Sequence, residues 1–184
     1  MFTSRRMHIA GIAVFAAAAL VACAVQPPAG KPPALGTAVG AEEVARWDIS
    51  IPPSGAGLPK GSGTARQGLP VYEQKCLACH GAKGVGKPAD VLVGGVGSLA
   101  SKTPLRTVGS YWPYATTLFD YVRRAMPITN PLSLSDDEVY AVSAYVLYLN
   151  GIVGEDEQMN AQSLPQVKMP NRDGFISDWP VRPR

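Results

Sequence analysis

Residues 75–81, KCLACHG, place two cysteines three positions apart, with a histidine directly after the second. Cys76, Cys79 and His80 could bind zinc, form a redox disulfide or attach a haem. A structural zinc site needs four ligands from cysteine, histidine or carboxylate groups. The only other histidine is His8, close to the start of the chain, so zinc is the poorest match. A redox disulfide of this spacing is typical of a βαβ unit, whereas this pair precedes a long glycine-rich stretch.

Covalent haem fits both the types and the spacing of these residues. On a helix, residues three apart point to the same side, so Cys76 and Cys79 can form thioethers with the two vinyl groups of one haem. His80 then lies under the ring and can bind the iron. The sequence therefore predicts one covalently attached haem c, with the two cysteines as its anchors and His80 as one axial ligand.

The first 22 residues have the proportions of an export signal. Arg5 and Arg6 form a positive start, and residues 9–21 are an apolar run that is too short for a comfortable membrane span. The run ends in LVAC, which resembles the bacterial lipobox, in which the cysteine carries a lipid. We therefore predict a lipoprotein-type signal peptide, a lipid on Cys23 and a periplasmic protein anchored to a membrane. The alternative is an ordinary signal peptide that happens to contain a cysteine.

The cysteine and charge counts narrow the function further. In an exported chain an exposed cysteine pair normally oxidises, and with Cys23 lipidated no other cysteine remains to pair with Cys76 and Cys79. This strengthens the haem interpretation. Without Arg5 and Arg6, 15 Lys and Arg face 14 Asp and Glu, and no long basic run occurs. The composition gives no support for nucleic-acid binding.

Proline and glycine divide the chain into four expected segments. After the signal peptide (1–22), residues 23–64 read as a flexible tether and an extended segment, because proline, glycine and alanine dominate much of this stretch. Residues 65–152 carry the helical patterns and form the expected domain. Residues 153–184 are acidic and then punctuated by proline, which predicts an extended C-terminal arm over the domain.

About three good helices are expected in the domain, and no convincing sheet. One begins near Gln67 and carries the haem motif, with Pro70 in its first turn. The second begins at Pro113 and ends before Pro127. The third, from Ser135 to Gly151, starts with a capping box between Ser135 and Glu138. The fold class is therefore all-α, and its small apolar core would be completed by a large apolar cofactor.

Methionine is the candidate for the second axial ligand, since no second histidine follows the signal peptide. Met126 stands in RRAMP, where Pro127 forces the chain off the preceding helix and can aim the thioether inward. Met159 and Met169 lie beyond the last helix, in the arm, and for any isolated methionine the simpler interpretation is core filler. We predict Met126 as the ligand. Histidine with methionine raises the potential of the iron and closes it to small molecules, which suits an electron carrier.

Two further residues are candidate contacts to the haem propionates. Trp112 carries an indole N–H that needs a partner when buried, and the Arg123 guanidinium could neutralise a carboxylate. The alternative for Trp112 is packing around the ring, and the alternative for Arg123 is a solvated helix face.

The pattern Gly68-x-x-x-Tyr72-x-x-x-Cys76-x-x-Cys79-His80 resembles the first helix of the class I cytochromes c. RRAMP is similar to the methionine segment of that family, and the resemblance covers roughly residues 65–152. It implies a small class I cytochrome c fold, with three to five helices around one covalent haem and extended N- and C-terminal arms. It also implies that the glycine and the tyrosine pack against the last helix, with Tyr145 and Leu149 as their counterparts.

A narrower resemblance involves TVGSYWPYATTLFDYVRRAMP, LSDDEVYAVSAYVLYLNGIV and VKMPNRDGF. These stretches resemble the cytochrome subunit of bacterial sulfane and sulfite dehydrogenases, which pair a molybdenum subunit with a cytochrome c in sulfur oxidation. The larger cytochrome subunits of that group carry two haem motifs, whereas this chain carries one.

The narrower resemblance implies an electron-transfer protein and not an enzyme in its own right. Its redox partners would be a molybdopterin dehydrogenase subunit and a downstream cytochrome or oxidase. Three alternatives stay open: a carrier for another dehydrogenase, a peroxidase or thiosulfate-oxidising cytochrome with an open or displaceable sixth ligand, and a structural lipoprotein with an incidental motif.

Overall fold

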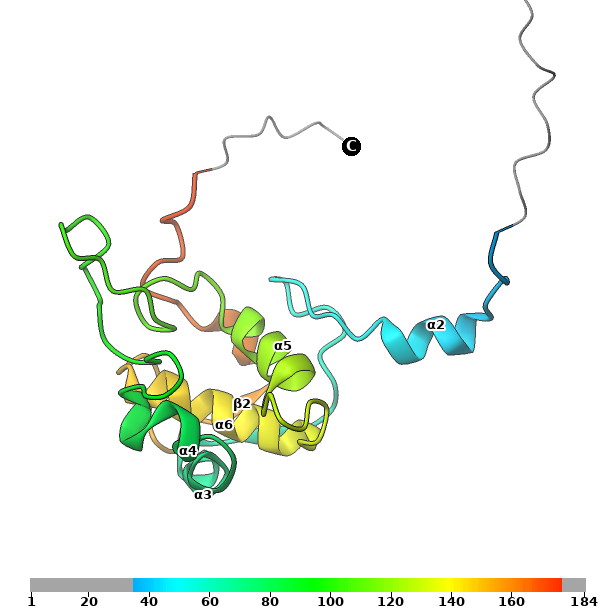
Figure 1. Ribbon diagram of the computed structural model, residues 1–184, viewed down its shortest axis with the longest axis horizontal. Coiled ribbons are helices and arrows are strands. Elements are labelled where there is room, and N and C mark those ends of the chain that lie inside the picture. Colours follow the sequence, from blue (N-terminus) through cyan, green and yellow to red (C-terminus); the bar gives the residue numbers. More distant parts are fainter. Residues whose placement is uncertain (1–34, 177–184) are drawn as a thin grey trace, which may run out of the picture. The chain divides into compact units, whose positions relative to one another are not determined.

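The computed structural model describes residues 35–176, which form the predicted all-α fold (Figure 1). The expected signal peptide and Cys23 lie outside these residues and stay predictions, as do the boundaries of the four expected segments. The chain separates into two compact units, one ending at Val44 and the other beginning at Ala45. Across the described residues, no helix is both long and apolar enough to cross a bilayer.

A short helix, α2 (Ala41–Trp47), lies where the sequence predicts tether and extended chain. Its sequence AEEVARW consists mainly of good helix formers. Glu42 and Glu43 stand in its first turn and Arg46 in its last turn, where they complement the helix dipole. None of its residues is buried. Local propensity and the charges near its ends therefore favour this helix, and no apolar periodicity in the sequence predicts it.

The haem motif follows α3 (Ala65–Lys75): Cys76 caps that helix, and the next four residues form α4 (Leu77–His80). A short 3₁₀ turn, η1 (Ala82–Gly84), comes next. A capping box starts α3: the Thr64 hydroxyl accepts from the Gln67 amide, and the Gln67 side chain accepts from the Thr64 amide at 2.9 Å. The helix thus begins two residues before the predicted start. Pro70 consequently lies in its second turn and not in its first.

The other two helices are α5 (Ala115–Ala125) and α6 (Asp136–Leu149). The predicted capping box of Ser135 and Glu138 is present at the start of α6. α6 is the centre of the domain, because every residue from Val139 to Leu147 is buried. Figure 1 shows α6 between α5 and the crossing helix α3, and both helices contact it.

The crossing of α3 and α6 depends on a glycine. A Cβ added at Gly68 would lie 1.9 Å from the carbonyl oxygen of Ala141, so only glycine lets the two backbones approach this closely. One turn further on, the rings of Tyr72 and Tyr145 pack with their centroids 5.2 Å apart. The expected packing of Gly68 and Tyr72 against α6 at Tyr145 is confirmed, whereas Leu149 lies beside Gly84.

A two-stranded antiparallel ladder joins the two ends of the domain. β1 (Ser62–Gly63) pairs with β2 (Met159–Asn160), and a 3₁₀ turn, η2 (Leu164–Gln166), follows. The sequence predicts no sheet, because two-residue strands are too short to show an alternating pattern. Met159, Leu164 and Met169 are all buried in the core. The stretch expected to drape over the domain therefore supplies part of its interior.

Candidate haem site

A cavity of about 370 Å³ is lined by residues from α3, α4, α5, α6 and the loops between them. Its lining is predominantly apolar, and its size falls in the range of cofactor sites. Five of the residues predicted from the sequence line it together: Cys76, Cys79, His80, Trp112 and Met126. An apolar cavity with two thiols, an imidazole and a thioether in its wall matches the donor set and the surroundings that covalent haem requires.

His80, at the end of α4, is oriented by a backbone contact. Its Nδ1 lies 2.9 Å from the carbonyl oxygen of Asp90, which accepts the Nδ1 proton and leaves Nε2 free to bind a metal. The next residue, Gly81, has φ +71°, and its carbonyl accepts a hydrogen bond from the Tyr72 hydroxyl at 2.8 Å. Burial raises the pKa of Tyr72 to about 12, so this hydroxyl remains a donor at neutral pH. The Asp90 carbonyl therefore orients the imidazole, and Tyr72 holds the backbone that follows His80.

The two cysteines are free thiols and do not form a disulfide. Burial, and then the neighbouring Cys79, raises the pKa of Cys76 to about 11. A structural zinc site needs four ligands and binds cysteine as the thiolate. Within residues 35–176, moreover, no three His, Cys, Asp or Glu side chains come together as a cation site. The arrangement favours haem attachment over zinc.

Met126 is the C-cap of α5, and its amide donates to the Val122 carbonyl at 3.1 Å. It lines the same cavity as His80. Met159 and Met169 are 0% and 3% exposed in the core and do not line this cavity. The structure thus brings Met126, and neither methionine of the arm, to the site. Its role as the ligand stays a prediction.

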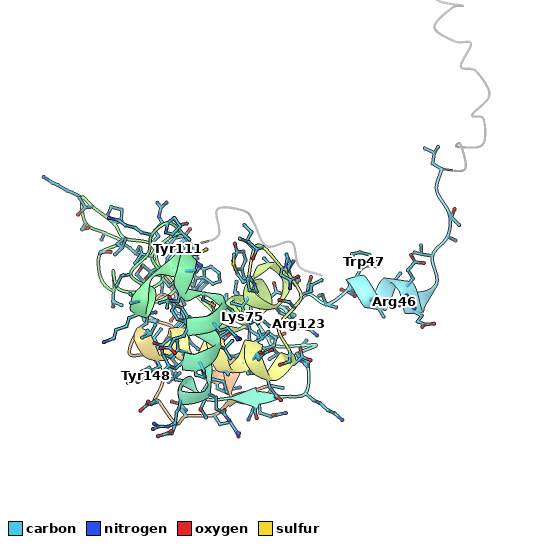
Figure 2. All side chains as sticks on the ribbon, turned by 60° about the horizontal axis from the view of Figure 1, so that its bottom comes forward. Arg46, Trp47, Lys75, Tyr111, Arg123 and Tyr148 are labelled. Atoms are coloured by element: carbon cyan, nitrogen blue, oxygen red, sulfur yellow. The ribbon has the colours of Figure 1, made fainter. Side chains whose placement is uncertain are left out.

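Of the two candidate propionate contacts, Trp112 reaches the cavity and Arg123 does not. Arg123 (labelled in Figure 2) donates from Nε to Asp136 Oδ1 at 3.2 Å and from Nη1 to the Ile49 carbonyl at 3.4 Å. The physical reason is helical geometry: Val122 lines the cavity, and the next residue points about 100° away around the helix. Arg123 therefore does not line the cavity, and its contact with a propionate stays a prediction.

Arg106, which the sequence analysis missed, lines the cavity instead. Its guanidinium carbon lies 5.6 Å from the centroid of the Tyr111 ring. Arg106 stands in an irregular loop, where no periodic pattern marks the direction of a side chain. Its sequence context therefore carried no signal that could have identified it.

Polar side chains order the loop that carries Arg106. The Thr107 hydroxyl, next to it, donates to the Gly94 carbonyl at 2.6 Å. Asn150, at the end of α6, donates to the Leu92 carbonyl at 3.2 Å and accepts from the Gly94 amide at 3.1 Å. The long glycine-rich stretch is thus tied to α6 on the side where it lines the cavity.

The cavity reaches the protein surface beside α5. Tyr121 and Ile128 both line it, and they are 45% and 73% exposed. Lys75 also contributes to the wall. The cavity is therefore open to solvent beside α5, where a bound partner would reach a group held in it.

Comparisons with known proteins found similarity to a solved structure and to a family model. The chain is 40% identical to a chain in the crystal structure of the sulfane dehydrogenase SoxCD from Paracoccus pantotrophus, with a TM-score of 0.74. The similarity covers 80% of this chain and 73% of that chain. The family model described as cytochrome C oxidase, cbb3-type, subunit III matches residues 63–146, a range that contains the haem motif and Met126. No match was found among curated protein sequences.

Proposed function

Because the chain belongs to the Sox-type cytochromes c, we propose that it is a periplasmic monohaem electron carrier. It accepts single electrons from a molybdenum dehydrogenase of the sulfite or sulfane type and passes them to a downstream cytochrome or oxidase. The observation that carries the proposal is that His80 and Met126 line one apolar cavity together with both cysteines. The chain is similar to a chain of the sulfane dehydrogenase SoxCD, and this similarity supports a partner of that class.

The residues of the chain have separate tasks in this proposal. Cys76 and Cys79 would hold the haem covalently, and His80, oriented by the Asp90 carbonyl, would bind the iron. Met126 would be the second ligand of the iron and would exclude small molecules. When bound, haem c supplies one-electron exchange between Fe(III) and Fe(II). We further propose that a lipid on Cys23 anchors the protein, a suggestion supported by the LVAC sequence at that point.

The methionine ligand is tested by its near-infrared thioether–iron band. We expect the ferric protein to show this weak band and Met126→Ala to abolish it while the haem stays covalently attached. Met159→Leu and Met169→Leu are the matched controls and should retain the band, because neither residue lines the cavity. If the wild-type protein lacks the band and binds carbon monoxide readily, it has an open site and the proposal of a simple carrier fails.

The partner is tested separately. We expect the protein extracted from native membranes to copurify with a subunit that contains molybdenum, detected by metal analysis. We also expect that subunit to reduce the ferric protein when its substrate is added. Reduction by a different dehydrogenase only would retain the carrier function and overturn the proposed partner class.

Arg106 provides a prediction about the reduction potential. A cation beside the haem favours the reduced state, so we expect Arg106→Gln to lower the potential by about 30–70 mV. Arg172→Gln is a matched control, because its guanidinium lies over the Tyr114 ring at 4.4 Å and does not line the cavity. Its effect should stay under about 10 mV, since exposed charges are screened by salt. Redox titration of the wild-type protein, Arg106→Gln and Arg172→Gln measures these two shifts. Equal potentials of the wild-type protein and Arg106→Gln would exclude Arg106 as a neighbour of the haem.

A further inference from the structure

Residues 49–53, which we call the strap, run along α5 and are held there by side chains of that helix. Three hydrogen bonds join the backbone of the strap to α5: Ile51 N to Asp120 Oδ1 (2.8 Å), Thr116 Oγ1 to Pro53 O (3.2 Å) and Arg123 Nη1 to Ile49 O (3.4 Å). The Ile51 side chain is buried in the core. The strap is therefore a fixed part of the domain, although it stands more than 60 residues before α5 in the sequence.

The strap and the cavity lie on opposite faces of α5. Thr116, Asp120 and Arg123 are spaced i, i+4 and i+7, which places them in one stripe along the helix. The cavity-lining residues of the helix, Leu118, Tyr121 and Val122, fall on the other side. Any shift or rotation of α5 that disturbs one face must therefore disturb the other.

Asp120 is the central contact of the strap. It is buried and also accepts two hydrogen bonds from Arg124, one turn further along α5. Burial alone would raise the pKa of Asp120, but the bonds from Arg124 and from the Ile51 amide outweigh burial and lower this pKa. An ionised carboxylate thus binds the strap amide at one oxygen while it holds the last turn of the helix.

The last turn of α5 ends at Met126, whose amide makes the final hydrogen bond of the helix. A metal ligand must be held within about 0.5 Å of its productive position by the groups that support it. We propose that Asp120 is a positioning residue, which keeps the Met126 thioether at the haem iron by fixing the strap to α5. This inference rests on the proposed function, because it takes Met126 as the ligand.

The test measures how easily an external ligand displaces Met126. Imidazole binds ferric haem only in the fraction of molecules whose methionine is detached, so its apparent Kd reports that fraction. We expect Asp120→Ala to bind imidazole about tenfold more tightly than the wild-type protein and to have a weaker near-infrared band. Asp120→Asn retains an oxygen that can accept from the Ile51 amide, and its Kd should stay within about threefold of wild type.

The matched control is Asp137→Ala. Asp137 Oδ1 accepts from the Ser62 amide at 2.7 Å, so it also holds incoming backbone with a carboxylate, but it belongs to α6. A role in stability alone would change the imidazole Kd of both alanine variants. If Asp120 positions Met126 through α5, only the imidazole Kd of Asp120→Ala changes. If Asp120→Ala does not retain haem, Thr116→Val removes a second strap contact more gently and should still tighten imidazole binding about twofold.

The outcomes separate the two proposals. A wild-type protein without the near-infrared band would show that Met126 is not the ligand and would remove the premise. If the wild-type protein has the band and the imidazole Kd of Asp120→Ala is unchanged, the positioning role alone is overturned. If Asp120→Ala does not retain haem, the Kd of Thr116→Val decides in its place. Equal effects of Asp137→Ala and Asp120→Ala would likewise overturn the positioning role.

Discussion

Replacement of Cys76 and Cys79 together by alanine is expected to abolish covalent haem and to leave the domain largely unfolded. Without the haem, the cavity of about 370 Å³ would lose the group that fills it. Loss of the haem would expose the apolar walls of this cavity to water, and the total stability of a typical domain is only about 5–15 kcal/mol. Haem staining after denaturing electrophoresis measures attachment, and far-ultraviolet circular dichroism measures the loss of helix.

Cys23→Ser is the control for this double variant. Cys23 is the third cysteine of the chain and is not part of the haem motif. We therefore expect Cys23→Ser to retain haem staining while it removes the proposed lipid. A double variant of Cys76 and Cys79 that still stained for haem would contradict the attachment site. A wild-type protein without staining would favour the structural lipoprotein with an incidental motif.

The second large effect is expected at the crossing of α3 and α6. In Gly68→Ala the new Cβ would lie 1.9 Å from the Ala141 oxygen and 2.8 Å from the Tyr145 Cβ, so the two helices must move apart. We expect the free energy of unfolding to fall by about 3 kcal/mol and the Tm by roughly 10 °C. Denaturant and thermal unfolding of the haem-loaded protein, followed by circular dichroism, give both quantities.

Gly154→Ala is the matched control for Gly68→Ala. Neither glycine has a positive φ, and the nearest atom to a Cβ at Gly154 is 3.7 Å away, which is an ordinary contact. This substitution should change the free energy of unfolding by less than about 0.5 kcal/mol. If the two alanine variants were equally stable, the close approach of α3 and α6 would not exist in solution.

Local sequence signals predicted the parts of the fold in which one short stretch determines its own structure. The haem motif, the capping box at Ser135 and the proline after Met126 each act within a few residues. The structure contains that capping box and gathers the motif and Met126 around one cavity. The contact of Tyr72 with Tyr145 was accessible only through the family resemblance, because it joins helices about 70 residues apart.

The features that the sequence did not reveal depend on tertiary contacts or on side-chain direction. The two-residue strands and the strap gain their stability from groups far away in the chain, such as the Asp120 carboxylate. The placement of Arg106 and Arg123 relative to the cavity has a different origin. A helical projection places Arg123 about 100° from the cavity-lining Val122, so helix geometry alone indicates that Arg123 does not line the cavity. No comparable rule exists for a loop residue such as Arg106.

The β1–β2 ladder has a consequence for the modularity of this domain. Ser62 pairs with Asn160 in antiparallel register, so the chain before Ser62 and the chain after Asn160 leave the ladder at the same end. Further out the two chains stay close, since a Cβ at Gly55 would lie 2.5 Å from Pro165. The strap before Ser62 and Met169 after Asn160 both belong to the core, so a recombinant version of this domain must retain both flanking segments. The ladder thus marks where the two ends of the core meet, and a fusion partner belongs beyond the strap on one side and beyond Met169 on the other.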